Sequence, residues 1–167
     1  MTFLNINEID IKVDASQFKQ NEIEVIVAIK LVKIYIEVEI SVKNIIILTK
    51  YTAQVQLLKR SLVSDSKVRN VKAYMIDSFQ DKEASVIILC MMRIRKLDFM
   101  SQFNCFLTVC NHAYDLFIML CNYDEFQHDY TCNLHMIQHV QNLFLINEVY
   151  KEYFSQQEFI DFMKTER

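Results

Sequence analysis

The pattern of hydrophobic and polar positions divides much of the chain into short apolar runs and stretches of helical periodicity. The run NIIILTK is apolar and β-branched, as in a strand buried on both faces of a sheet, and YTAQVQLLKRSL after it carries apolar residues at helical spacing. Further strands are predicted at VKAYMID, ASVIILCMM and DLFIMLCN, with a helix at SQFNCFLTVCNHAY before the last of them. This alternation predicts an α/β domain over residues 1–122, with a mostly parallel sheet and helices on both faces.

The pattern is less regular toward both ends of the chain. A short alternation in FLNINEIDIKV is typical of an edge strand. Residues 21–34 have near-helical spacing and predict a helix, whereas the continuation YIEVEISV alternates and predicts a strand or loop. After Asn122 the β-branched runs cease, and the apolar spacing predicts a helical C-terminal extension over residues 123–167.

Polar residues follow three of the predicted strands. In parallel sheets, ligands gather at the carboxyl ends of the strands. Residues 49–54, residues 77–83 and Asn122 are therefore expected at or near one rim of the sheet, where they would form a binding edge.

The composition lacks glycine, proline and tryptophan altogether. At average usage a chain of this length would carry roughly twenty glycines and prolines together, so positions that need a positive φ must be filled by Asn, Asp or a strained residue. The formal net charge is -3, with 52% hydrophobic and 23% charged residues, which is typical of a globular protein. Any phosphate-binding surface would have to be local.

The cysteines and histidines do not predict a metal site. Five cysteines form no CxxC pair and follow no leader segment, which favours an intracellular protein, cytoplasmic or nuclear, without a membrane span. Spacings of four, three and four residues place His128, Cys132, His135 and His139 near one helix face. On one straight helix the first and last would lie about 16 Å apart, too far for a single tetrahedral ion.

Four sequence strings occur in an order that is typical of one protein family. ILTKYTAQVQLL resembles a segment in which a strand ends in Thr-Pro-Tyr and a Gln follows on the next helix, and VKAYMIDSFQDKEASVIILCMMR resembles Asp-x-Phe-Gln-Gly-x-Glu between two buried strands. FNCFLTVCNHAYDLFIMLCN is similar to Leu-Asn-Val-Ala-Leu-Thr-Arg-Ala followed by a strand, and NEIE to an Asn-x-x-Glu helix start. These strings, over residues 3–122, resemble the second RecA-like motor domain of Upf1-like superfamily 1 helicases.

The resemblance implies a RecA-like fold that binds ATP with Mg²⁺ and single-stranded RNA or DNA. It implies these ligands only together with a first RecA-like domain, which supplies the phosphate loop. By position in the strings, the implied nucleotide contacts are Glu83, Gln80 and Tyr51, and the implied nucleic-acid contacts are Gln54, Ser78 and Thr108. Structural alternatives are a surface ion pair for Glu83, loop hydrogen bonds for Gln80 and Ser78, and a core anchor for Phe79.

The chain also departs from the family pattern. Val109 stands where the family has an arginine, Asp81 replaces a glycine, and Lys50 replaces a proline. Loss of an arginine finger typically costs about 10³ to 10⁵ in rate, and a chain without glycine cannot contain the usual phosphate loop. We therefore predict no catalytic residue and no autonomous ATP hydrolysis. The alternatives are a degenerate helicase-like structural or interaction module, a decayed fragment, or an unrelated α/β nucleotide-binding domain.

Overall fold

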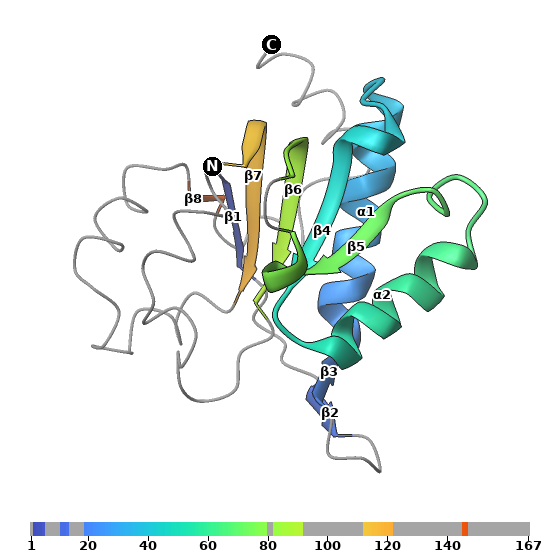
Figure 1. Cartoon of the computed structure of the whole chain (residues 1–167), viewed down its shortest axis with the longest axis vertical. Coiled ribbons are helices and arrows are strands. Elements are labelled where there is room, and N and C mark those ends of the chain that lie inside the picture. The colour runs from blue at the N-terminus through green and yellow to red at the C-terminus, as the bar shows by residue number, and fades with distance from the viewer. Residues whose placement is uncertain are drawn as a thin grey trace.

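The computed structural model describes residues 2–5, 11–13, 19–79, 82–91, 112–121 and 145–146. A six-stranded sheet in the order β5-β4-β6-β7-β1-β8 forms its centre, and each neighbouring pair in it is parallel (Figure 1). Its strands are β1 Thr2–Asn5, β4 Ile45–Thr49, β5 Lys72–Met75, β6 Ala84–Cys90, β7 Ala113–Cys121 and β8 Leu145–Ile146. This arrangement confirms the predicted α/β, RecA-like fold class.

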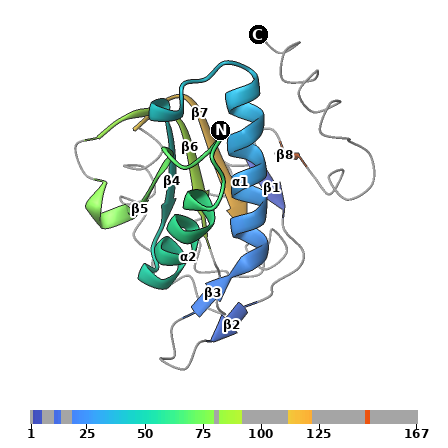
Figure 2. The ribbon, with the colours of Figure 1, turned by 90° about the vertical axis from the view of Figure 1, so that its right-hand side faces the viewer.

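Two helices lie on the same face of this sheet, as Figure 2 shows: α1 Glu22–Glu37 and α2 Thr52–Val63. Because α2 joins β4 to β5, the predicted strand followed by a helix is confirmed. Two single-turn 3-10 helices, η1 Val42–Asn44 and η2 Ile76–Ser78, flank the strands. A separate antiparallel pair, β2 Ile11–Val13 and β3 Lys19–Asn21, leads into α1.

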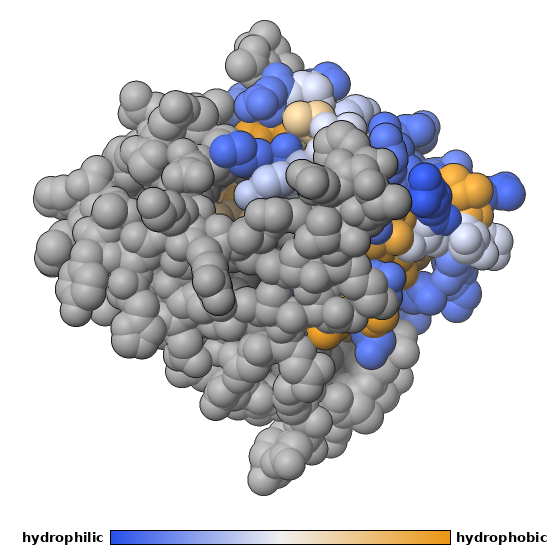
Figure 3. Space-filling model, turned by 90° about the horizontal axis from the view of Figure 1, so that it is seen from below, coloured by the Kyte–Doolittle hydropathy of each residue, from blue (hydrophilic) through white to orange (hydrophobic). Residues whose placement is uncertain are grey.

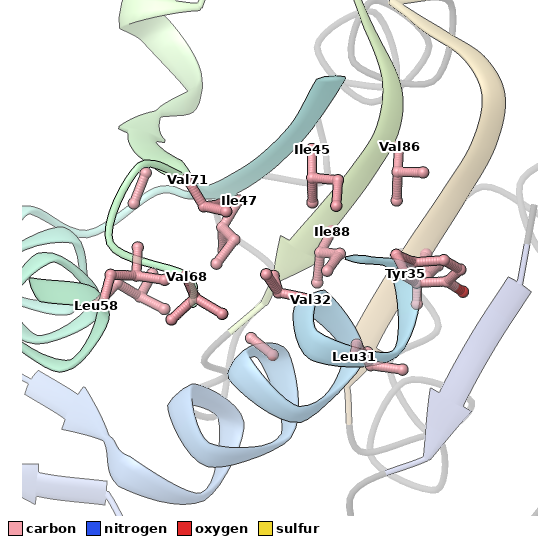
Figure 4. Packing of buried hydrophobic residues seen from close by; sticks show 14 of the residues in the cluster. Leu31, Val32, Tyr35, Ile45, Ile47, Leu58, Val68, Val71, Val86 and Ile88 are labelled. Atoms are coloured by element: carbon pink, nitrogen blue, oxygen red, sulfur yellow. The ribbon is translucent and has the colours of Figure 1, made fainter. Parts of the chain in front are cut away.

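The core between the helices and the sheet consists of branched aliphatic side chains. Ile45 and Ile47 of β4 pack with Ile88 of β6, Leu31 of α1 and Leu58 of α2, all buried (Figure 4). Burial of each such side chain contributes about 1.5–3 kcal/mol. Every residue of β4 is buried, which confirms the prediction of a strand covered on both faces.

The first half of the chain departs from prediction in two places. Residues 35–37 continue α1, and a turn and loop follow over residues 38–41. Of the predicted strand or loop in YIEVEISV, the strand is therefore wrong and the loop is confirmed after residue 37. Tyr35 and Val38 are buried in the helical face of the core, and this packing outweighs the local alternation. The edge strand predicted in FLNINEIDIKV is wrong for β1, which lies between β7 and β8, and is confirmed for β2, which pairs with β3 alone.

The second half departs at segment ends. Ala113 and Tyr114 begin β7 and do not end a helix. Leu145 and Ile146 form β8 beside β1, where a helix was expected. Apart from these positions and His112, the helix predicted at residues 101–114 and the C-terminal extension lie outside the described residues. The predicted domain boundary at residue 122 therefore stays a prediction.

The end of α1 shows how this chain turns without glycine. The backbone N–H of Glu39 donates to the carbonyl of Ile36 at 3.0 Å, and that of Ile40 to the carbonyl of Tyr35 at 2.9 Å. These two bonds form a Schellman motif, which requires a left-handed residue at its centre. Glu39 occupies that place with φ 70°, where glycine is the usual residue.

Glu39→Gly should therefore stabilise the protein. Relief of about 1–2 kcal/mol of left-handed strain exceeds the roughly 0.4–1 kcal/mol lost to the freer unfolded chain, so we expect a net gain of about 0.5–1 kcal/mol in urea denaturation. The matched control is Glu37→Gly in the last turn of the helix, which should lower stability by about 0.5–1 kcal/mol. Equal destabilisation by both substitutions would contradict the strain at Glu39.

Candidate functional site

The side-chain amide of Gln54 joins α2 to the start of α1. Its Oε1 accepts a hydrogen bond from the backbone N–H of Asn21 at 2.9 Å, and its Nε2 donates to the backbone carbonyl of Asn21 at 3.0 Å. Asn21 caps α1, since its Oδ1 accepts from the N–H of Glu24 at 3.1 Å. The strings NEIE and YTAQ therefore meet in space across 33 residues.

This bridge gives Gln54 a structural role. The side chain is fully buried, and both of its polar atoms are bonded to the backbone of Asn21. Buried in this way, Gln54 presents no polar atom to a ligand, so the nucleic-acid contact predicted for it does not fit this structure. The pattern Tyr-x-x-Gln identified Gln54 as a candidate. Its partner, Asn21, lies 33 residues away along the chain, and a local sequence pattern cannot indicate such a contact.

Besides Asn21 and Gln54, the buried polar side chains in the described ranges are Glu24 and Thr49, and the buried thiol of Cys90 lies near both. Thr49 and Cys90 are aligned in neighbouring strands. Burial, together with the charge of Glu24, raises the pKa of the Cys90 thiol well above its ordinary value. A protonated, buried thiol is a poor nucleophile, so Cys90 is a structural residue.

The turns after β4 and β5 meet at the carboxyl rim of the sheet. The Thr52 hydroxyl contacts the sulfur of Met75 at 3.3 Å, and the Ser78 hydroxyl donates to the Met75 carbonyl at 2.8 Å. Tyr51 is half-buried at the start of α2, and Ser78 is exposed. The structure thus brings Tyr51 and Ser78 to one rim, as the strand pattern predicted.

Glu83 lies at the opposite end of the sheet. It directly precedes Ala84, the first residue of β6, whose last residue, Cys90, is aligned with Thr49. At about 3.3 Å per residue, roughly 20 Å separate the two ends of β6. The expectation that residues 77–83 share one rim is therefore wrong for Glu83, because the connection must return to the amino edge before a parallel strand begins.

A row of aromatic side chains accompanies this connection. The Phe79 ring is buried and lies 6.0 Å from the rings of both Tyr74 and His112, which confirms Phe79 as a core anchor. Lys82 reaches back along the row, with Nζ 4.4 Å from the centre of the Tyr74 ring. The same Nζ donates to the carbonyl of Ser78 at 3.3 Å. Sequence reasoning missed these roles of Tyr74 and His112, since neither stands at a defining position of its motif string.

The remaining candidate positions are Gln80, Asp81, Thr108 and Val109, together with the four metal-ligand types in residues 128–139. All of them lie outside the described residues, and the roles of Gln80 and Thr108 stay predictions. Within the described ranges, no helix has the length and hydrophobicity needed to cross a membrane.

Hydrophilic residues predominate in the part of the described surface that Figure 3 shows from below, and hydrophobic areas lie among them. The exposed large apolar side chains in the described ranges, Ile26, Val63 and Tyr114, stand on three different elements. Single exposed apolar residues are ordinary on a protein surface and indicate no binding face by themselves.

Gln54→Leu should destabilise the protein strongly. The substitution would leave the buried N–H and C=O groups of Asn21 without Gln54 as a partner, which should cost about 2–4 kcal/mol in urea denaturation. Gln56→Leu on the exposed face of the same helix is the matched control, and we expect a change within about 0.5 kcal/mol. Similar small effects of both substitutions would show that the bridge is dispensable.

A comparison with known families agrees with this architecture. A family model described as an AAA domain matches residues 1–124, a range that contains both helices and every described strand except β8. No curated protein matches the chain. The family covers the C-terminal region of Upf1-like helicases, in the RecA-like superfamily. The chain therefore belongs to this AAA-domain family and contains a helicase-like domain.

Proposed function

We propose that the chain is the second motor domain of an ATP-dependent RNA or DNA helicase. The observation that carries this proposal is the placement of the motif segments at two edges of one parallel sheet. Tyr51 and Ser78 lie at the carboxyl rim, and Glu83 lies at the amino end of β6. One edge suits a nucleotide and the other a nucleic-acid strand.

Glu83 suits the sugar of a nucleotide. Its side chain is exposed, and a carboxylate accepts hydrogen bonds from ribose hydroxyls but repels a phosphate chain. We assign the ribose of ATP to Glu83, with Gln80 beside it in the sequence. The phosphates and Mg²⁺ would be held by a first RecA-like domain, because this glycine-free chain cannot form the usual phosphate loop.

The carboxyl rim suits single-stranded nucleic acid. Lys50 and Tyr51 are consecutive there and supply a cation and an aromatic ring, while Ser78 supplies a hydroxyl. Stacking of a base on an aromatic side chain contributes about 1–3 kcal/mol. Because about 20 Å separates the two ends of β6, Tyr51 and Glu83 do not share one ribose. We therefore move Tyr51 from the nucleotide to the nucleic-acid contacts, alongside Thr108.

The two edges should respond separately to substitution. Glu83→Gln removes a charged hydrogen-bond acceptor and should weaken ATP·Mg²⁺ binding about tenfold, with no change for single-stranded RNA or DNA. Tyr51→Ala should weaken the binding of single-stranded RNA or DNA about tenfold and leave ATP·Mg²⁺ binding unchanged. Equilibrium dialysis with labelled ATP and fluorescence anisotropy with a labelled oligonucleotide, both with a first RecA-like domain present, would measure the two affinities.

Matched controls exist on the same chain. Glu37→Gln makes the same charge change on the exposed face of α1, and Tyr114→Ala removes a tyrosine that is 67% exposed. Neither should alter binding. Loss of both ligands in either test variant, with unchanged thermal unfolding, would count against two separate edges.

A second candidate function, a helicase-like module without catalysis, is favoured by Val109 and by the missing glycines. On either view, this chain alone should show no ATP hydrolysis stimulated by nucleic acid. Val109 stands where the family's arginine would stabilise the transferred phosphoryl group, and a chain without glycine has no usual phosphate loop. A phosphate-release assay would check this. Turnover that Glu83→Gln abolishes would refute the expectation.

A further inference from the structure

The side chain of Lys82, just before β6, contacts β5 and the 3-10 turn that follows β5. The ammonium of Lys82 lies 4.4 Å from the centre of the Tyr74 ring and donates to the Ser78 carbonyl at 3.3 Å. Lys82 is thereby bound both to the strand before the connection and to the 3-10 turn at its start. We call this pair of contacts the Lys82 latch.

Ser78 and Tyr74, which Lys82 contacts, are themselves held in place by other contacts. The Ser78 hydroxyl donates to the Met75 carbonyl at 2.8 Å, and the Tyr74 ring packs beside the buried Phe79. At the other end, the Ala84 N–H donates to the His112 carbonyl at 3.0 Å. Residues 82 and 83 lie between these anchors, so the latch restrains the backbone that carries Glu83.

The latch also turns the lysine away from its acidic neighbour. Among the described residues, Glu83 forms no ion pair, and the Lys82 ammonium is directed to the ring and the carbonyl. The carboxylate therefore keeps its charge available to a ligand while the adjacent cation serves the loop. In the sequence, Asp81 occupies the place of a flexible glycine, so the loop has to be shaped by side-chain contacts.

We propose that Lys82 is a positioning residue, whose contacts with Tyr74 and Ser78 hold Glu83 in the orientation that meets the nucleotide. The role in nucleotide binding rests on the function proposed above. The latch itself does not, since it concerns the order of the loop.

The test uses three variants and two measurements. Lys82→Met keeps the length of the side chain and removes its charge, Lys82→Arg keeps the charge and the contact with the ring, and Tyr74→Leu removes the ring. Hydrogen exchange of the backbone amides of residues 82–84 reports the order of the loop. Equilibrium dialysis with ATP·Mg²⁺, with a first RecA-like domain present, reports the consequence for nucleotide binding.

Lys82→Met should speed exchange and weaken ATP binding, each by about two- to fivefold, as expected for an exposed cation–π contact. Lys82→Arg should restore both values. Tyr74→Leu removes the ring contact but leaves the bond to the Ser78 carbonyl, so its effect should be smaller than that of Lys82→Met. In the double variant it should add nothing to Lys82→Met, because the ring contact is already lost. Lys72→Met, which removes an exposed charge from β5, is the control and should change neither value.

The outcomes separate the latch from the proposed function. Unchanged exchange in Lys82→Met, or equal weakening of ATP binding in Lys72→Met, would overturn the positioning role. If Glu83→Gln leaves ATP binding unaltered, the nucleotide assignment fails. Faster exchange in Lys82→Met would then still support the latch.

Discussion

The two hydrogen bonds between Gln54 and the backbone of Asn21 set the geometry on which the helical face depends. Asn21 is both the last residue of β3 and the cap of α1, so the Gln54 amide fixes the point where α1 begins relative to α2. Leu31 of α1 and Leu58 of α2 belong to the same core cluster, so the packing of the core also depends on the relative position of the two helices. Because the bonds are buried, a shift of either helix would leave polar groups unpaired at about 1–3 kcal/mol each.

The absence of glycine constrains the turns in a different way. At Glu39 the chain accepts a left-handed conformation with a full side chain, and two backbone bonds of the Schellman motif hold it there. In the connection from β5 to β6, order comes from the Lys82 ammonium and from Phe79 in the core. The turn at Glu39 is thus held by local backbone bonds, whereas the connection from β5 to β6 depends on contacts with neighbouring segments.

Sequence reasoning succeeded where the signal is local. The buried strands β4 and β6 follow from their apolar runs, α2 follows from its periodicity, and Phe79 was recognised as an anchor. It failed where strand pairing decides the outcome. The place of β1 between β7 and β8 depends on partners more than 100 residues away, and the position of Glu83 depends on the parallel register of β6.

The candidate site shows the same limit of sequence reasoning, because the structure separates residues that are consecutive in a motif. A motif string such as DSFQDKE suggests one site because its residues are consecutive, yet in a parallel sheet this segment must cross from one edge to the other. Ser78 remains near the carboxyl rim, whereas Glu83 lies at the amino end of β6. The bond from Lys82 to the Ser78 carbonyl joins the two halves of the segment.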